Sequence, residues 1–223
     1  MNYTGQNVID RARFTLLDAG AKAWKPEELL AWLNDSRSRA FELRPDIFEN
    51  TADFVCVAGS KQTVPDGSTR LFEVEHNVSH KGKREITLTT DQVLARFRPL
   101  WRSMKPANEI EHYLYDEADG GEFEVYPPAI NTTSIRISYA KPPAEITALA
   151  TVLTAEGELA AAYLDYVLAR SFFKESDTAP EFTQRANNHM ALFENAVSTD
   201  ARTKIVLSPN TQREGGTPPQ ASA

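Results

Sequence analysis

The sequence predicts an α+β protein in which helices from both ends of the chain form a bundle around an inserted antiparallel β domain. Apolar residues recur with helical spacing near both ends of the chain, and the spacing changes to two between about residues 52 and 140. The last stretch is rich in Pro, Gly, Ser and Gln and cannot build a core, which indicates an extended tail. We therefore expect helical segments at 1–49 and 144–201, a β domain at 50–143 and a tail at 202–223.

Two helices are expected in the N-terminal segment. The first covers residues 6–18, with Ile9 and Ala12 on its apolar stripe, and Ala19-Gly20 stops it. The second lies in WKPEELLAWLNDSRSRAFELRPD. Pro26 suits the first helical turn and Pro45 ends the helix.

The middle of the chain reads as short strands. FVCVA, LFEVEHNV and REITLTT have strand spacing, the last two on either side of a turn in SHKGK, and AGSKQT reads as a hairpin turn. TTDQVLARFRPLWRSM interrupts the strands with a short helix, and EHYLYDEADGGEFEVY follows as a hairpin. Pro127-Pro128 is expected to close one strand and Pro142-Pro143 the next, which places the boundary of the β domain there.

Helical spacing returns after Pro143. Thr154 is a candidate N-cap for a helix that carries Leu159 and Tyr163, and Thr178 with Glu181 forms a capping box for the next helix. A short apolar patch at residues 205–207 then precedes the polar tail.

Charge and cysteine content exclude several classes of protein. The net charge of −7 argues against a surface that grips nucleic acid, although it allows a wall along which DNA slides. The single cysteine, Cys56, excludes an internal disulfide and fits a reducing compartment at synthesis. Neither a signal peptide nor an apolar run long enough to span a membrane is visible, so no membrane partner is expected.

The search for catalytic or metal-binding motifs yields little. His76 and His80 have a metal-ligand spacing only if they lie on a helix, and the context here is strand and turn. Residues 116–122 bunch carboxylates beside two glycines, but their spacing does not match a calcium loop. We expect no enzyme, no cofactor and no metal site.

Two alternatives to a purely structural role stay open. In the first, the β domain is a tail-associated binding module that recognises a fibre or a carbohydrate through Tyr113, Tyr115 and Tyr126. In the second, more remote one, a hydrolase acts through His112 and the acidic turn at Asp116 and Asp119.

Four stretches in order resemble a known family. They are WKPEELLAWLN with ELRPD at 24–46, HYLYDEADGGEFEVYPP at 112–128, SYAKPPAEI at its exit, and AAAYLDYVLARSFFKESDTAPEFTQRANNHMALF at 160–193. This succession resembles the head-to-tail adaptor, or connector, proteins of short-tailed bacteriophages, relatives of tail tubular protein A.

The resemblance implies a structural virion protein at the neck between capsid and tail. Such adaptors form a twelve-fold ring under the portal protein, extend the DNA channel without specific DNA binding and give the tail nozzle protein a platform. The helical body makes the ring and the C-terminal segment reaches the portal. We expect portal contacts from Arg202, Lys204, Ile205, Val206 and Leu207. We expect inter-subunit contacts from Trp24, Trp32, Tyr163, Tyr166, Phe172 and Phe173.

Overall fold

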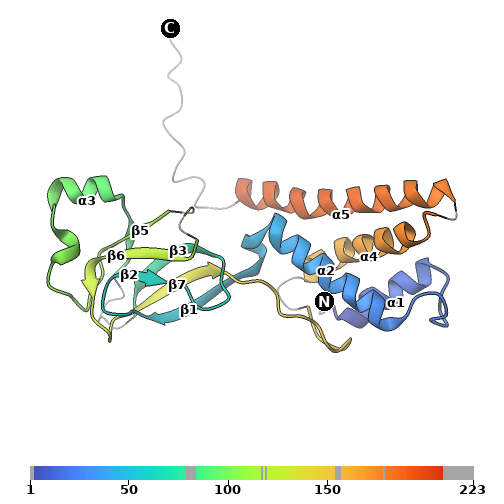
Figure 1. Ribbon diagram of the computed structural model, residues 1–223, viewed down its shortest axis with the longest axis horizontal. Helices are drawn as coiled ribbons and strands as arrows, with labels where there is room; N and C mark the ends of the chain where they lie inside the picture. The colour runs from blue at the N-terminus through green and yellow to red at the C-terminus, as the bar shows by residue number, and fades with distance from the viewer. Residues whose placement is uncertain are drawn as a thin grey trace, which may run out of the picture. The chain divides into compact units, whose positions relative to one another are not determined.

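The protein has a mixed α+β fold that divides into two compact units. One unit comprises Met1–Arg44 and Ala144–Ala223, and the other Pro45–Pro143. The computed structural model describes residues 3–78, 84–116, 118, 120–153, 157–177 and 179–207, with the backbone alone for residues 157 and 199–207. Helices α1, α2, α4 and α5 belong to the first unit, and the seven described strands to the second (Figure 1).

Helix α1 spans Gly5–Thr15 and is capped at its start. The side chain of Thr4 accepts a hydrogen bond from the backbone N–H of Asn7, and the side chain of Asn7 accepts one from the N–H of Thr4. Val8, Ile9 and Ala12 are buried on its inner face. The helix is shorter than the predicted 6–18 range.

A tight loop explains why α1 ends early. Leu17 and Ala21 both adopt positive φ angles, at 57° and 51°, which no α-helix allows. The carboxylate of Asp18 holds this loop, because it accepts hydrogen bonds from the backbone N–H groups of Lys22, Ala23 and Trp24. An aspartate that gathers its downstream N–H groups competes with the helix and ends it.

Helix α2 spans Pro26–Leu43, which confirms the prediction for this segment. Pro26 stands in the first turn, and the helix ends just before Pro45. Leu29, Leu33 and Ala40 are buried, as the apolar spacing indicates. Arg37 is also buried, and its Nη1 donates to the carbonyl of Ala144 at 2.6 Å.

Helix α4, Ala160–Lys174, is the central helix of its unit. It follows the short 3-10 helix η4 (Gly157–Leu159) and packs against α1, α2 and α5. Burial therefore extends over most of its circumference. Its buried residues are Ala160, Ala162, Tyr163, Val167, Leu168, Ala169, Ser171 and Phe172. The predicted caps Thr154 and Thr178 lie outside the described residues.

Helix α5 spans Pro180–Leu207 and runs alongside α4 (Figure 1). Ala186, Phe193 and Val197 are buried at helical spacing. The prediction that the extended tail begins at residue 202 is wrong, since the helix continues to Leu207. Arg202, Lys204 and Leu207 favour a helix and the β-branched residues between them only mildly disfavour it, so the first residue that strongly breaks the helical pattern is Pro209.

Two sheets form the second unit. The first has the order β1-β7-β3, with β1 at Glu49–Val55, β7 at Ser134–Ala140 and β3 at Arg70–Asn77, all antiparallel. The second has the order β2-β6-β5-β4, with β2 at Gly59–Thr63, β6 at Glu122–Ala129, β5 at His112–Tyr115 and β4 at Thr87–Leu88. One core takes buried side chains from both sheets, among them Leu71, Val74, Tyr113, Val125, Ile135 and Ile137.

The predicted hairpin of β5 and β6 is confirmed, but its second strand does not close at the proline pair. Strand β6 continues through Pro127 and Pro128 to Ala129, with a cis peptide bond between Tyr126 and Pro127. At this position the hydrogen bond uses the carbonyl of Pro128, which accepts from the N–H of Ala107 at 2.8 Å. A proline fits a strand where no donor is required of it.

Two further predictions about the β domain are wrong. AGSKQT is a strand rather than a turn, because Gly59–Thr63 forms β2 and pairs with β6. The expected hairpin of LFEVEHNV and REITLTT is reduced to a bridge between His76 and Glu85, and β4 pairs in parallel with β5. The sheet is therefore not wholly antiparallel.

Cys56 lies between β1 and β2 and is 2% exposed. Burial raises the pKa of its thiol to about 12. The thiol therefore stays protonated at neutral pH, as expected for a core cysteine and not for a nucleophile.

Candidate functional site

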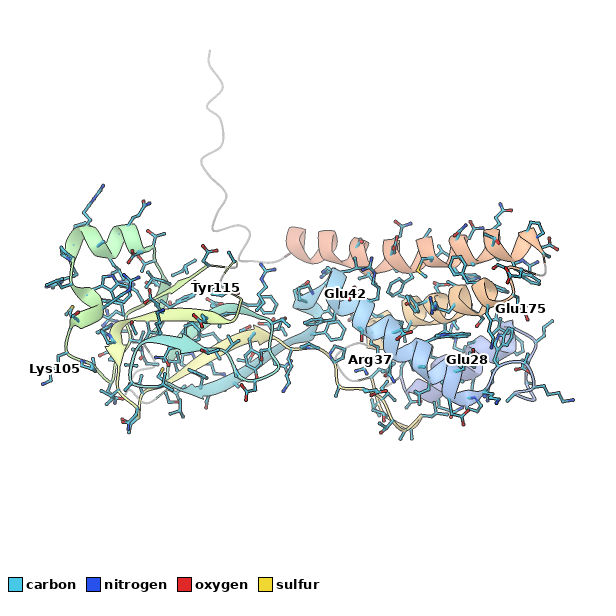
Figure 2. All side chains as sticks on the ribbon, in the orientation of Figure 1. Glu28, Arg37, Glu42, Lys105, Tyr115 and Glu175 are labelled. Carbon is cyan, nitrogen blue, oxygen red and sulfur yellow. The ribbon has the colours of Figure 1, made fainter. Side chains whose placement is uncertain are left out.

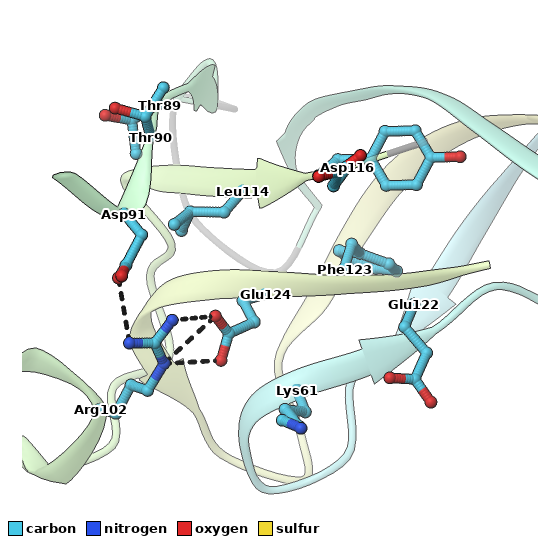
Figure 3. A pocket seen from close by; sticks show the side chains of 11 residues that line it. Lys61, Thr89, Thr90, Asp91, Arg102, Leu114, Asp116, Glu122, Phe123 and Glu124 are labelled. Atoms are coloured by element: carbon cyan, nitrogen blue, oxygen red, sulfur yellow. Dashed lines mark hydrogen bonds and ion pairs between the residues drawn. The ribbon is translucent and has the colours of Figure 1, made fainter. Parts of the chain in front are cut away.

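An open cleft of about 970 Å³ lies in the β unit, beside the start of helix α3 (Asp91–Phe97) (Figure 3). Strands β2, β5 and β6 and the 3-10 helix η2 (Trp101–Ser103) contribute to it. Its lining residues are Lys61, Thr89, Thr90, Asp91, Arg102, Leu114, Tyr115, Asp116, Glu122, Phe123 and Glu124. Four of these side chains are carboxylates and two are cations, so the cleft is acidic on balance.

Arg102 organises one wall of the cleft. Its Nε donates to Oε1 of Glu124 at 2.9 Å and its Nη2 to Oε2, a bidentate pair, and its Nη1 lies 3.0 Å from Asp91 (Figure 3). The hydrogen bond to Glu124 is the main reason that the pKa of the Arg102 guanidinium is raised. The guanidinium also lies over the ring of Trp101, 4.3 Å from its centroid.

Helix α3 is held against the sheet by a small apolar cluster of Leu94, Trp101, Leu114 and Tyr126. Thr90 caps the helix by accepting from the N–H of Val93, and Trp101 Nε1 donates to Asp91 at 3.2 Å. These contacts settle which face of the helix points inward.

Helix α3 and the residues just after it expose three large apolar side chains. Val93 is 48% exposed, Phe97 74% and Leu100 78%, whereas Leu94 is buried. Arg96 and Arg98 are also exposed. We call Val93, Arg96, Phe97, Arg98 and Leu100 the α3 knob.

Of the residues in the hydrolase hypothesis, the two that the structure describes, His112 and Asp116, do not share the cleft. His112 lies with its Nδ1 2.6 Å from Thr87 Oγ1 and its ring stacked on Tyr126, and it does not line the cleft. Asp116 lines the cleft and accepts from the N–H of Ala118. Asp119 lies outside the described residues, as does His80 of the histidine pair. Within the described ranges, no group of three or more His, Cys, Asp or Glu could hold a metal ion.

The aromatic residues of the binding-module hypothesis mostly point inward. Tyr113 is 5% exposed in the main core and Tyr126 8% exposed in the cluster under α3. Tyr115 is half-buried, and its hydroxyl donates to the carbonyl of Gly120. Buried rings cannot stack on a ligand, so Tyr113 and Tyr126 serve the packing of the β unit, whereas Tyr115 lines the cleft.

The six residues expected at subunit contacts divide into two groups. Trp24, Tyr163 and Phe172 are buried inside the helical unit, where they support the packing of its helices. Trp32 and Tyr166 are half-buried, the latter edge-on to Phe193, and Phe173 is 36% exposed. Only the second group offers surface to a neighbouring molecule.

The expected portal contacts, Arg202, Lys204, Ile205, Val206 and Leu207, all fall in the last turns of α5. Their backbone is helical, and their side chains lie outside the described residues.

Two features were not found from the sequence. The pair of Arg102 and Glu124 joins residues 22 positions apart, and no spacing rule marks such a pair. The exposed apolar residues of α3 were not marked by spacing either, because Val93, Leu94 and Phe97 are neighbours on the helix surface and only the fold shows that Leu94 alone is buried.

The chain matches the model of a known protein family. The family model of the SU10 adaptor protein matches residues 1–213. No curated protein matches the chain. Among the described helices, none combines the length and the apolar character that crossing a membrane requires.

This match covers nearly the whole chain and confirms the resemblance to phage head-to-tail adaptors. The family is a structural one, and its members are virion components that contact other virion proteins such as portal and tail components. The chain belongs to the SU10 adaptor protein family.

Proposed function

We propose that this chain is the subunit of a twelve-fold adaptor ring that docks under the portal, extends the DNA channel and carries the tail nozzle. The observation that carries the proposal is the family match over residues 1–213. A head-to-tail adaptor must present one surface to the portal and another to the tail.

The helical unit supports the ring-forming part of the proposal. Residues from both chain ends pack into it, and Asn34 on α2 is tied to Ile146 after the insertion by two hydrogen bonds. Trp32 and Phe173 keep exposed surface there and are the candidates for contact with a neighbouring subunit. The buried rings of Trp24, Tyr163 and Phe172 pack between the helices that carry Trp32 and Phe173.

The C-terminal arm supports the docking part. In the proposal, residues 202–207 extend from the helical unit to the portal, with Arg202 and Lys204 for polar contacts and the apolar residues 205–207 for a pocket. The net charge of −7 suits a channel wall, because repulsion of phosphate keeps DNA from adhering during ejection. Assembly would take place in the host cytoplasm, where Cys56 stays reduced.

A mixing experiment with the portal protein of the same phage tests the proposal. We expect co-migration in size-exclusion chromatography with light scattering, and an added ring on one face of the portal in negative-stain images. Separate migration with an intact portal ring would contradict it.

Truncations test the arm. A chain that ends at Ala201 is expected to keep its fold and lose portal attachment. The matched control ends at Leu207 and is expected to attach. Attachment of the shorter chain would show that the arm is not the docking segment.

A further inference from the structure

We propose that the α3 knob of one copy of this chain docks into the acidic cleft of the β unit of a second copy. The inference rests on the proposed ring-forming function, because it names a contact between neighbouring subunits. Neither the family match nor the sequence patterns assign a role to the knob or to the cleft.

The knob has the composition of a docking surface. It exposes three large apolar side chains close together, of which Phe97 and Leu100 are each about three-quarters exposed, at 74% and 78%. A soluble protein seldom leaves such a group in water without a use. The segment VLARFRPLWRSMK, residues 93–105, also carries four basic residues and no acidic one in a chain of net charge −7.

The knob does not fill the cleft of its own copy, since none of its five residues lines that cleft. Leu94 fixes the inner face of α3 against Trp101, Leu114 and Tyr126. Val93 and Phe97 lie near Leu94 on the helix surface, yet both remain largely exposed. Neither of them lines the cleft. Within the described part of the β unit these side chains keep surface that another molecule can contact.

The cleft complements the knob in charge and in apolar surface. Asp116 and Glu122 are exposed on its wall, and no ion pair is found for either of them within the described part of the chain. The carboxylates of Asp91 and Glu124 are already neutralised by Arg102. Leu114 and Phe123 line its floor, so an arriving Phe97 or Leu100 meets apolar surface and Arg96 or Arg98 meets carboxylate.

A second copy is favoured over other partners because each copy carries both halves of the contact. A knob on one side and a cleft on the same unit make a heterologous contact, which repeats from subunit to subunit and closes into a ring when the rotation allows. DNA would pair with the arginines, but it would leave the apolar face of the knob and the acidic cleft unused.

Charge reversal tests the contact with full-length protein. The knob variant carries Arg96→Glu and Arg98→Glu, and the cleft variant carries Asp116→Lys and Glu122→Lys. Each variant alone is expected to self-associate about tenfold or more weakly than the wild type, because two attractive pairs become repulsive. A 1:1 mixture of the two is expected to recover assembly, since the reversed knob fits the reversed cleft. The matched control reverses exposed charges of the same unit elsewhere, Glu73→Lys with Lys141→Glu, and is expected to behave as wild type.

Assembly is measured by sedimentation velocity and native mass spectrometry, and circular dichroism verifies that each variant is folded. Disulfide trapping adds a readout that does not depend on strong association. A chain with Leu100→Cys is mixed with a mass-tagged chain with Glu122→Cys, and a mixed disulfide is expected. The native Cys56 is buried and does not compete.

The outcomes separate the contact from the proposed function. Portal capture that is unchanged in both charge variants, with no mixed disulfide, overturns the contact and leaves the adaptor role standing. Recovery in the mixture without portal capture of the wild type supports the contact and contradicts the adaptor role. Loss of binding to a double-stranded DNA fragment in the knob variant, without recovery in the mixture, overturns the contact in favour of DNA.

Discussion

Asn34 and Ile146 lie 112 residues apart in the sequence and are joined by two hydrogen bonds. The side-chain amide of Asn34 donates to the carbonyl of Ile146 at 3.0 Å and accepts from its N–H at 2.9 Å. This reciprocal pair fastens the chain where it returns from the β unit to the helical unit. It joins the N-terminal and the C-terminal segment of the helical unit.

Replacement of Asn34 tests this closure. In Asn34→Ala the N–H and carbonyl of Ile146 lose their partners, and we expect the free energy of unfolding to fall by about 1–3 kcal/mol. Chemical denaturation followed by circular dichroism measures the loss. Asn187→Ala, at an exposed position of α5, is the control and is expected to be neutral or slightly stabilising. Equal effects at the two positions would contradict the role of Asn34.

Truncation of Phe193 tests how α5 is held. Its side chain is fully buried and meets the ring of Tyr166 edge-on, with 5.1 Å between centroids. We expect Phe193→Ala to lower the free energy of unfolding by about 3–5 kcal/mol, because a large cavity remains. The adjacent Leu192 is 54% exposed, and Leu192→Ala is expected to change stability by less than about 0.5 kcal/mol. Thermal unfolding measures both variants. A much larger loss for Phe193→Ala than for Leu192→Ala indicates that α5 is packed, and equally small losses indicate that it is loosely attached.

Arg102 is expected to matter modestly for stability. Its side chain is 48% exposed, so solvent screens the pair with Glu124, and Arg102→Ala should lower the free energy of unfolding by about 0.5–1 kcal/mol. A double-mutant cycle with Glu124→Gln measures the coupling, and Arg98→Ala is the control for loss of one exposed cation. A coupling energy of zero would mean that the bidentate pair does not hold the wall of the cleft (Figure 3).

The loop at Asp18 predicts a specific dependence on pH. The pKa of Asp18 is lowered from its ordinary 3.8, chiefly by the hydrogen bond from the backbone N–H of Trp24. The ionised carboxylate therefore stabilises the folded state above the ordinary pKa, and this contribution is lost as the pH falls through the lowered value.

Asp18→Asn removes that titration. The wild type is expected to be more stable than the variant at pH 6, with the difference shrinking as the pH falls below about 4. Unfolding midpoints measured between pH 2.5 and 6 test this, and Asp10→Asn on the exposed face of α1 is the control. A difference that does not change with pH would show that the loop does not depend on the charge of Asp18.

Charged side chains occur in both units, for example Glu28 and Glu175 in the helical unit and Lys105 in the β unit (Figure 2). Charge alone therefore does not mark a contact surface in the sequence. The α3 knob became visible because its basic residues coincide with exposed apolar ones, and exposure is a property of the folded chain.

The sequence by itself determined the elements that depend on neighbouring residues. Pro26 and Pro45 delimit α2, the two-residue period marks β7, and the acidic turn with its glycines marks the hairpin of β5 and β6. These signals are local, because helix and strand periodicity and the turn preferences of proline and glycine act within a few residues. The resemblance of four stretches to phage adaptors was also visible in the sequence, because it depends on the order of the motifs along the chain. The family match over residues 1–213 confirms it.

Only the tertiary structure decided which elements meet. Strand β4 pairs in parallel with β5 instead of closing a hairpin with β3, and β6 passes through Pro127-Pro128 because Ala107 supplies the donor to its carbonyl. Tyr113 and Tyr126 face the core, whereas Phe97 and Leu100 face solvent, although all four are large and apolar enough to be buried. Such choices depend on partners distant in the sequence, whose contact energies no local pattern contains.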